Sequence, residues 1–126
     1  MDTDWPTREG SNYYTALVED SRSLCLLAYP AQDLKGTVVG HLVGRISRPN
    51  PLRPGAVVAV LESMRVSPDH RRRGIGTLLM GHFRGWARSE GANEASVTAY
   101  SANASAISFY CHHGFVPFEL TLHQRL

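Results

Sequence analysis

The sequence has few of the features that mark secreted, membrane-spanning or nucleic-acid-binding chains. Its two cysteines, Cys25 and Cys111, are too few and too far apart for a disulfide framework, so we expect two reduced thiols. No apolar run approaches the ~20 residues of a membrane span, and the acidic first residues are unlike a secretory signal. The net charge of +2 gives no general argument for binding nucleic acid or an anionic membrane. We therefore expect a cytoplasmic protein that spans no membrane.

What is present suits one globular domain. The chain has 126 residues, and its hydrophobic fraction of 43% is enough for a core. The first part is polar and contains Pro6, so we expect a flexible segment over residues 1–12. Residues 13–126 are expected to form the single domain.

Apolar spacing and breaker residues predict a mixed α/β order. In the first half we expect a short helix at 13–19, a buried strand at 24–29, a turn at Lys35-Gly36, β structure at 37–47 and a proline-rich loop at 48–55. In the second half we expect a central strand at 56–66 covered on both faces, a helix from Gly74 to near Gly91, a strand at 94–100, a helix at 103–113 and a last strand at 115–122.

A basic turn with two glycines separates the predicted central strand from the helix, in the order Arg71-Arg72-Arg73-Gly74-Ile75-Gly76. The first turn of a helix has amide N–H groups without internal partners and the positive end of the macrodipole. Glycines let a phosphate approach those amides, and arginines complement its oxygens. The segment therefore predicts a loop that cradles a diphosphate.

Other phosphate-binding loops fit this segment poorly. A dinucleotide fingerprint would require a third glycine where Leu79 stands, and a Walker A loop requires a Gly-Lys-Ser/Thr sequence that is absent. Taken alone, however, the glycine pair is equally compatible with a solvated turn that merely begins a helix.

Two blocks of residues together resemble the GCN5-related N-acetyltransferase (GNAT) superfamily. The first is Met64-x-Val66-x-Pro68-x-x-Arg71-x-x-Gly74-x-Gly76, which matches the Arg/Gln-x-x-Gly-x-Gly/Ala signature at all three fixed positions. The second is Asn103-x-x-Ala106-x-x-Phe109-Tyr110-x-x-x-Gly114-Phe115, which resembles a later helix of the family at the expected distance. The resemblance covers about residues 13–126 and is strongest over 56–118. It implies an α/β fold with a mixed sheet, shortened at the N-terminus because only about 56 residues precede the central strand.

The resemblance also implies acetyl-CoA as co-substrate. Its pyrophosphate would lie on the backbone amides of residues 71–77, and its pantetheine arm would pair with the strand around Met64, where a diverging neighbour strand leaves a wedge. Asn103 would contact it from the other side. The implied cofactor-binding residues are Met64, Arg65, Val66, Arg71, Arg72, Arg73, Gly74, Ile75, Gly76, Thr77, Asn103, Ala106, Phe109 and Tyr110.

Three catalytic roles follow for an amine that attacks a thioester. Tyr110 resembles the family's tyrosine that protonates the leaving thiolate, although a tyrosine packed in the core is the alternative. By the same resemblance, the Val66 amide would donate to the oxyanion. Glu62 interrupts an apolar strand, where desolvation would make it base-like on the side of Met64, unless a bulge intervenes. Its alternatives are exposure to solvent or pairing with Arg45 or Arg65.

The sequence thus indicates an N-acetyltransferase that acts on a primary amine of a small molecule or protein through a ternary complex. The alternative is a GNAT-like module that binds acyl-CoA without catalysis. A nucleic-acid-binding domain is disfavoured because the basic residues cluster only at 71–73. Cys111-His112-His113 cannot converge on one ion at ~100° per helix residue, so we expect no metal. A homodimer is expected from the exposed sheet edge that the short N-terminus would leave.

Overall fold

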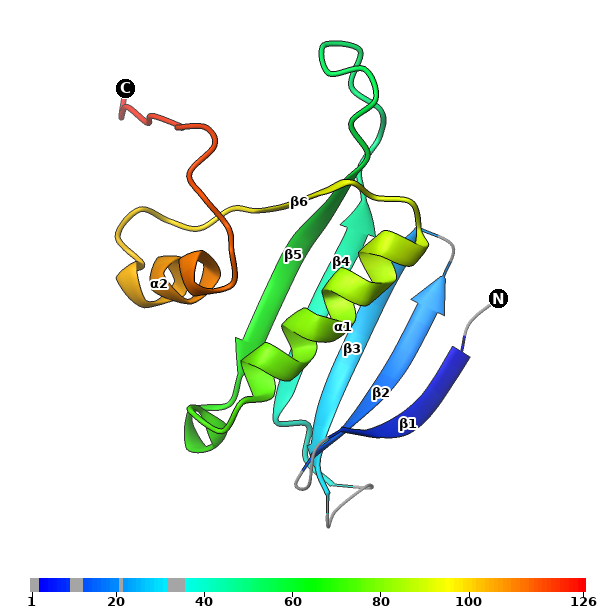
Figure 1. Cartoon of the computed structure of the whole chain (residues 1–126). Coiled ribbons are helices and arrows are strands. Elements are labelled where there is room, and N and C mark those ends of the chain that lie inside the picture. The colour runs from blue at the N-terminus through cyan, green and yellow to red at the C-terminus, as the bar shows by residue number, and fades with distance from the viewer. Residues whose placement is uncertain (1–2, 10–12, 21, 32–35) are drawn as a thin grey trace.

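The computed structural model of the protein describes residues 3–9, 13–20, 22–31 and 36–126, with side chains for 22–31 and 36–126. The described strands form one mixed sheet in the order β1-β2-β3-β4-β5-β6 (Figure 1). Neighbours from β1 to β5 are antiparallel, whereas β6 pairs with β5 in parallel. The strands are β1 Thr3–Glu9, β2 Tyr13–Asp20, β3 Ser23–Pro30, β4 Gly40–Ile46, β5 Val58–Val66 and β6 Glu94–Val97, and the helices are η1 Pro68–His70, α1 Ile75–Ser89 and α2 Ala104–His112.

Helix α1 covers one face of the sheet (Figure 1). Its apolar residues recur at helical spacing, as the sequence predicted, and form the core with alternate residues of β3, β4 and β5. The buried residues of α1 are Ile75, Leu79, Met80, Phe83, Trp86 and Ala87. Gly91 follows the helix with φ +86°, in the left-handed conformation that favours glycine after a helix C-terminus.

Two glycines of β4 let α1 lie close to the sheet. A Cβ atom on Gly44 would lie 2.8 Å from Cε1 of Phe83, and one on Gly40 would lie 3.2 Å from Cγ2 of Ile75. A side chain at Gly44 would therefore push α1 away from β4. Gly40 and Gly44 therefore determine how close α1 lies to the sheet, and this distance also determines where the N-terminus of α1 lies.

Two expectations for the N-terminal part are wrong. Residues 13–19, predicted as a helix, belong to β2, which pairs with β3 from Tyr13↔Pro30 to Asp20↔Ser23. Residues 3–9 of the segment expected to be flexible form β1, while residues 1–2 and 10–12 lie outside the described part. Pairing along a full neighbouring strand is a long-range interaction, and it outweighs a weak local helix propensity.

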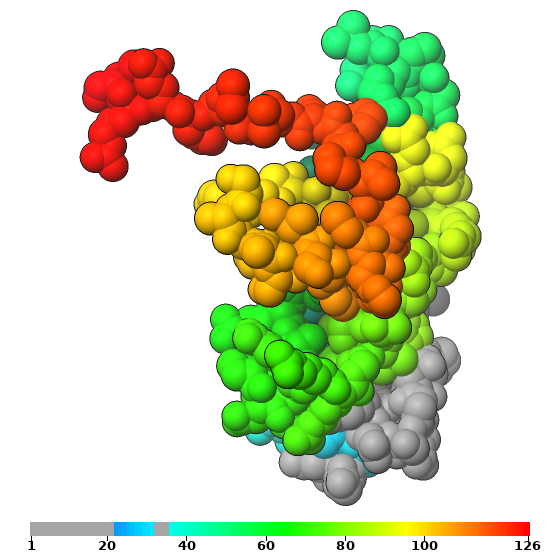
Figure 2. Space-filling view, turned by 60° about the vertical axis from the view of Figure 1, so that its left-hand side comes forward, coloured from blue at the N-terminus to red at the C-terminus, as the bar shows by residue number. Residues whose placement is uncertain are grey.

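The last predicted strand is also wrong. Residues 115–126 contain no strand, and Figure 2 shows them extending away from the body of the molecule. Their alternate apolar side chains are exposed: Val116, Phe118, Leu120 and Leu122. An alternating pattern produces a strand only when a neighbouring strand supplies the hydrogen bonds, and here none of the described strands lies beside it.

The other expected elements are confirmed with shifted ends. Strands β3, β4 and β5, the loop at 48–55 and helices α1 and α2 lie where the sequence placed them. Strand β6 ends at Val97 instead of continuing to Tyr100. The predicted turn at Lys35-Gly36 falls partly outside the described residues. No helix of the described part is long and apolar enough to cross a membrane.

Candidate functional site

Strands β5 and β6 part halfway along β5. Their parallel pairing runs from Val58↔Glu94 to Leu61↔Val97, whereas β5 continues to Val66. Figure 1 shows β6 leaving the sheet toward α2. From residue 62 onward, this edge of β5 has no strand beside it in the described part of the chain. A wedge therefore opens between the two strands, as the resemblance predicts.

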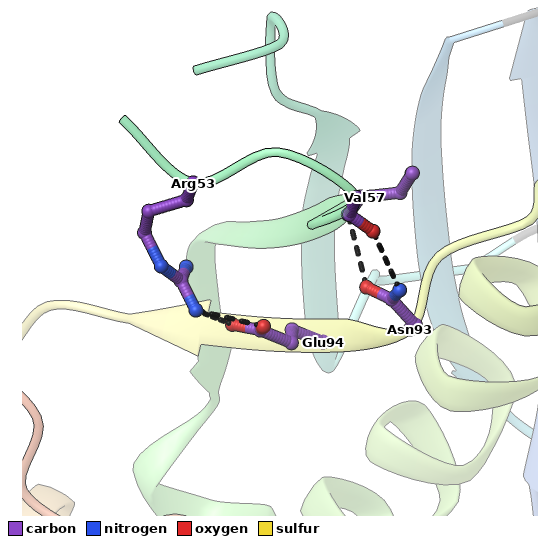
Figure 3. Close-up of polar contacts among 5 residues, drawn as sticks. Arg53, Val57, Asn93 and Glu94 are labelled. Atoms are coloured by element: carbon purple, nitrogen blue, oxygen red, sulfur yellow. Dashed lines mark hydrogen bonds and ion pairs between the residues drawn. The ribbon is translucent and has the colours of Figure 1, made fainter. Parts of the chain in front are cut away.

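Polar contacts join β5 and β6 where the two strands begin (Figure 3). Arg53 donates through Nη2 to both carboxylate oxygens of Glu94, at 2.9 and 2.8 Å. The backbone amide of Val57 donates to Oδ1 of Asn93 at 2.9 Å, and the backbone amide of Asn93 donates to the Val57 carbonyl at 2.9 Å. These contacts tie the start of β6 to the loop before β5, so the strands begin together and separate afterwards.

A β-bulge at Glu62 changes which side chains face the wedge. Val43 pairs with Ser63 and Gly44 pairs with Leu61, so Glu62 is the extra residue on β5. Leu61 lies on the face covered by α1, as do Met64 and Val66, whose partners on β4 are core-facing. Glu62 and Ser63 both lie on the opposite face.

Glu62 takes up the alternatives that the sequence left open. A bulge does intervene and puts its side chain on the face opposite Met64, and this side chain is 42% exposed. Its carboxylate accepts from Arg45, one of the pairings left open by the sequence. Beside it, Oγ of Ser63 and Nε2 of His41 are hydrogen-bonded at 2.9 Å. None of the described helices lies over this face, so the prediction that β5 is covered on both faces is wrong.

Alternation of the backbone shows which groups face the wedge. The Ser67 amide donates to the Val39 carbonyl at 2.8 Å, so the backbone polar groups of Ser67 point toward the β4 side of the strand. Successive residues of a strand point their N–H and C=O groups to opposite edges, so residues two apart point to the same edge. Met64 and Val66 consequently direct theirs toward the open edge, where an extended ligand can pair with them as a further strand would.

The loop at 71–76 presents a helix N-terminus that no side chain caps. Gly74 is the N-cap residue with φ +81°, and Leu78 is the first amide to bond back, to the Gly74 carbonyl at 3.0 Å. The amides of Ile75, Gly76 and Thr77 precede it and have no intrahelical acceptor. Arg72 has φ +63°, and such left-handed turns help backbone N–H groups converge on an anion.

The three arginines of this loop differ in their contacts. Arg71 donates through Nε to the Val66 carbonyl at 3.1 Å, which holds the loop against the end of β5. Arg72 and Arg73 are exposed, with their charges beside the uncapped helix. A diphosphate would thus meet backbone amides at the helix start and two guanidinium groups at the rim, while Arg71 keeps strand and loop together.

Helix α2 packs against the first turn of α1 (Figure 2). The Phe109 ring lies so close to Gly76 that a Cβ there would be 3.1 Å from Cε1 and Cζ. At the end of α2, Nε2 of His113 lies 3.3 Å from Oγ1 of Thr77, and its carbonyl accepts from Nη1 of Arg84 at 3.2 Å. Gly76 therefore has a packing role that the sequence did not reveal, whereas a Cβ on Gly74 would meet nothing within 4 Å.

Tyr110 lies on α2, and Asn103 immediately precedes this helix, as predicted. Tyr110 is half-buried, with its ring edge-on to Phe109 and Phe115, and burial raises the pKa of its hydroxyl. The phenol therefore stays protonated at neutral pH and can donate a proton. Asn103 is the N-cap of α2, and its Oδ1 accepts from the Ala106 amide at 3.2 Å. Because Oδ1 caps the helix, the side-chain amide nitrogen of Asn103 is the group left to donate a hydrogen bond to a ligand.

Several contacts of the site were not found from the sequence. The sequence excluded His113 as a metal ligand and indicated no other role for it in the site. The structure adds its contacts with Thr77 and Arg84, which depend on how α2 packs against α1. Burial, followed by the charges of Arg84 and His112, lowers the pKa of His113. No group of three potential metal ligands occurs among the described residues.

A family model described as the acetyltransferase (GNAT) family matches residues 2–115. Over 96 residues, or 72% of the chain, the sequence is 35% identical to acetyl transferase GW6a from Oryza sativa subsp. japonica. Over 55 residues, or 44% of the chain, it is 40% identical to streptothricin acetyltransferase from Streptomyces lavendulae. The chain spans only 23% and 29% of the lengths of these two relatives.

Solved structures share the fold at low sequence identity. An aminoglycoside N-acetyltransferase AAC(6')-Iy in complex with CoA superposes with a TM-score of 0.70 at 19% identity, over 86% of this chain and 69% of that one. The apo aminoglycoside 6'-N-acetyltransferase AAC(6')-IG from Acinetobacter haemolyticus gives 0.69 at 24% identity, over 85% and 72%. The mixed sheet with α1 on it is thus the architecture of these acetyltransferases.

Proposed function

Since the chain belongs to the GNAT acetyltransferase family, we propose that it transfers an acetyl group from acetyl-CoA to a primary amine. One observation carries this proposal: the open edge of β5 at Met64 and Val66 lies beside the uncapped N-terminus of α1. Arg71 joins the two through its bond to the Val66 carbonyl. An elongated donor with a diphosphate at one end and an amide-bearing arm at the other fits both features together.

The residues proposed to hold acetyl-CoA form three groups, each of which would contact a different part of acetyl-CoA. The amides of residues 71–77 would receive the pyrophosphate, with Arg72 and Arg73 at its rim. The backbone at Met64 to Val66 would pair with the pantetheine arm. From α2, Asn103, Ala106, Phe109 and Tyr110 would border the other side of the wedge. The donor supplies the activated acetyl group as a thioester.

The proposed reaction is direct attack within a ternary complex. The amine nitrogen forms a bond to the acetyl carbon, the carbon–sulfur bond breaks, and the sulfur leaves as a thiolate. A lysine-like ammonium has a pKa of ~10.4, so the removal of its proton at pH 7 costs roughly 4–5 kcal/mol of free energy. Glu62 is proposed to accept that proton, Tyr110 to donate one to the thiolate, and the Val66 amide to stabilise the oxyanion.

A second candidate is an acyl-CoA-binding module without catalysis. The observation that favours it is the ion pair of the exposed Glu62 carboxylate with Arg45, because this carboxylate is already engaged with a cation of the protein itself. In that case the donor would bind as proposed and no amine would be acetylated. The acceptor in the first candidate is a small-molecule amine, as the names of the streptothricin and aminoglycoside enzymes suggest, or a protein amino group.

A homodimer and a cytoplasmic location remain predictions. The feature that supports a second copy as partner is the stretch from Val116 to Leu122, whose four apolar residues alternate symmetrically about Glu119. Two copies paired antiparallel about that residue would place Val116 opposite Leu122 and Phe118 opposite Leu120. Sedimentation of the wild type and of a Phe118→Lys variant tests this interface: a dimer lost in the variant supports it, and a monomeric wild type contradicts it.

A thiol-release assay tests the proposed function. The protein is mixed with acetyl-CoA and a panel of primary amines, and free CoA is measured against a blank without amine. Release that depends on both amine and protein supports the transferase. Binding of acetyl-CoA without release from any amine supports the second candidate. Absence of acetyl-CoA binding at millimolar concentration contradicts both.

A further inference from the structure

A small cavity lies on the sheet where β4 begins and β5 ends. Its volume is about 100 Å³, and its lining consists of Val38, Val39, Gly40, His41, Arg65 and Ser67. His41 and Arg65 are register partners across β4 and β5, so their side chains lie on the same face. That face is the one opposite α1, because the neighbouring pair Leu42↔Met64 faces the core.

Among the described side chains of this face, basic groups outnumber acidic ones. Among the described side chains of β3, β4 and β5, the outward-facing charged groups are Arg45, Glu62 and Arg65. Glu62 is paired with Arg45, so the two charges offset each other. Arg65 is exposed and has no carboxylate partner among the described residues. The cavity is therefore bordered by the imidazole of His41 and by a guanidinium that no carboxylate of the described residues neutralises.

The residue that borders the cavity on β5 lies on the same strand as the proposed base. Arg65 comes three residues after Glu62, which corresponds to roughly 10 Å along a strand. Both residues lie on the same face, next to the edge where the donor would pair. One small molecule can thus reach from the carboxylate of Glu62 to the guanidinium of Arg65.

We propose that the acceptor is a primary amine that also carries an anionic oxygen group, either a carboxylate or a phosphate. This inference rests on the proposed function and identifies the substrate class for that site. The amine would lie at Glu62, and the anionic group would enter the cavity beside Arg65 and His41. A guanidinium donates two parallel hydrogen bonds to a carboxylate or phosphate, which fixes orientation as well as adding affinity.

The same charges disfavour a polycationic acceptor. An aminoglycoside carries several ammonium groups, and each additional one would meet Arg45 or Arg65, beside which the described side chains place no free carboxylate. Like charges brought together at a binding surface lower affinity and exclude partners. The acceptor class of this chain therefore differs from the class named for its structural relatives.

Matched amines test the inference. Acetylation by the wild type is measured for ω-amino acids of two to six carbons, for their neutral carboxamides, for phosphoethanolamine against ethanolamine, and for kanamycin. We expect kcat/KM to be about tenfold higher for the carboxylate or phosphate member of each pair, the worth of one charge-assisted contact. The two anionic series separately show whether carboxylate or phosphate is preferred.

Variants of the proposed contact complete the test. Arg65→Gln should abolish the preference for the anionic member, Arg65→Lys should restore part of it, and Arg88→Gln, an exposed arginine of α1, should leave it unchanged. Equal rates within each pair, or a preference for kanamycin, would overturn the inference while leaving the transferase intact. If no amine is acetylated, the proposed function fails. In that case, calorimetric titration with N-acetyl ω-amino acids tests the inference separately. If Arg65→Gln weakens their binding about tenfold relative to the wild type, the inference is supported. If their affinity is unchanged in the variant, or if the wild type does not bind them, the inference is overturned.

Discussion

The ring of Phe109 lies against the backbone of Gly76, where any Cβ atom would come within 3.1 Å of two ring carbons. This contact joins the helix that carries Tyr110 to the first turn of the helix proposed to hold the pyrophosphate. The two glycines of the loop consequently do different things. Gly74 adopts a left-handed conformation in open space, whereas Gly76 provides room for a neighbouring ring.

The first prediction concerns Gly76→Ala. The added methyl should push Phe109 away, loosen α2 and weaken acetyl-CoA binding by roughly tenfold, measured by calorimetry. In a Phe109→Leu background the same change should cost less, with a coupling free energy of about 1 kcal/mol. Additive effects of the two substitutions would contradict the contact.

Gly74→Ala is the matched comparison within the loop. No atom lies within 4 Å of its would-be Cβ, but φ is +81°, so alanine would be strained by about 1–2 kcal/mol without a steric clash. We expect a lower melting temperature that Phe109→Leu does not relieve. Relief by that substitution would show that both glycines act through α2.

Tyr110→Phe tests the proposed acid. Burial raises the pKa of this hydroxyl, so the group stays protonated through neutral pH and can supply a proton to the leaving thiolate. Removal of the hydroxyl should lower kcat by roughly 100-fold and leave the dissociation constant for acetyl-CoA nearly unchanged. Unchanged turnover would exclude Tyr110 from the mechanism, and Tyr100→Phe, at an exposed tyrosine, is the control.

Glu62→Gln tests the proposed base on the open face. The amide keeps the size of the side chain but cannot accept the proton of the ammonium, so kcat should fall by roughly 100-fold. Glu119→Gln, at an exposed carboxylate of the C-terminal segment, should retain wild-type turnover. Full activity of Glu62→Gln would show that the proton leaves by another path.

The contact between α2 and α1 should respond to acid. In the folded state the pKa of His113 is lowered by burial and by the charges of Arg84 and His112, whereas an unfolded histidine titrates near 6.5. The folded state thus binds fewer protons, so its full stability holds above about pH 6.5 and declines as the pH falls through the lowered pKa of His113. The melting temperature should fall on acidification, and less so in His113→Gln. An equal fall in His113→Gln and in wild type would contradict this assignment, with the exposed His123→Gln as control.

Local sequence patterns predicted the parts of the fold that are stabilised by interactions between residues close in sequence. The helical spacing from Ile75 to Ala87 and the N-cap at Asn103 are examples, since each depends on residues within a few positions. The strand at residues 13–20 was mistaken for a helix because its stability comes from pairing with β3. The segment at 115–122 was mistaken for a strand because alternation alone does not supply a partner.

The site was predictable to the same extent. The sequence located the loop at 71–76 and the strand beside it, because both belong to one continuous motif. The bulge at Glu62 depends on the register between β4 and β5, and it moved that carboxylate to the other face. The contacts of Gly76 with Phe109 and of Thr77 with His113 join residues more than thirty positions apart, which no local pattern contains.

The most direct test of the account is a calorimetric titration of the protein with acetyl-CoA and, separately, with S-acetylpantetheine, which lacks the pyrophosphate. Acetyl-CoA should bind with a dissociation constant between about 1 µM and 1 mM. S-acetylpantetheine should bind at least roughly 100-fold more weakly, because it cannot use the amides and arginines of the loop at 71–76. Equal affinity for the two ligands, or no binding of acetyl-CoA, would contradict the claim that this loop holds the donor.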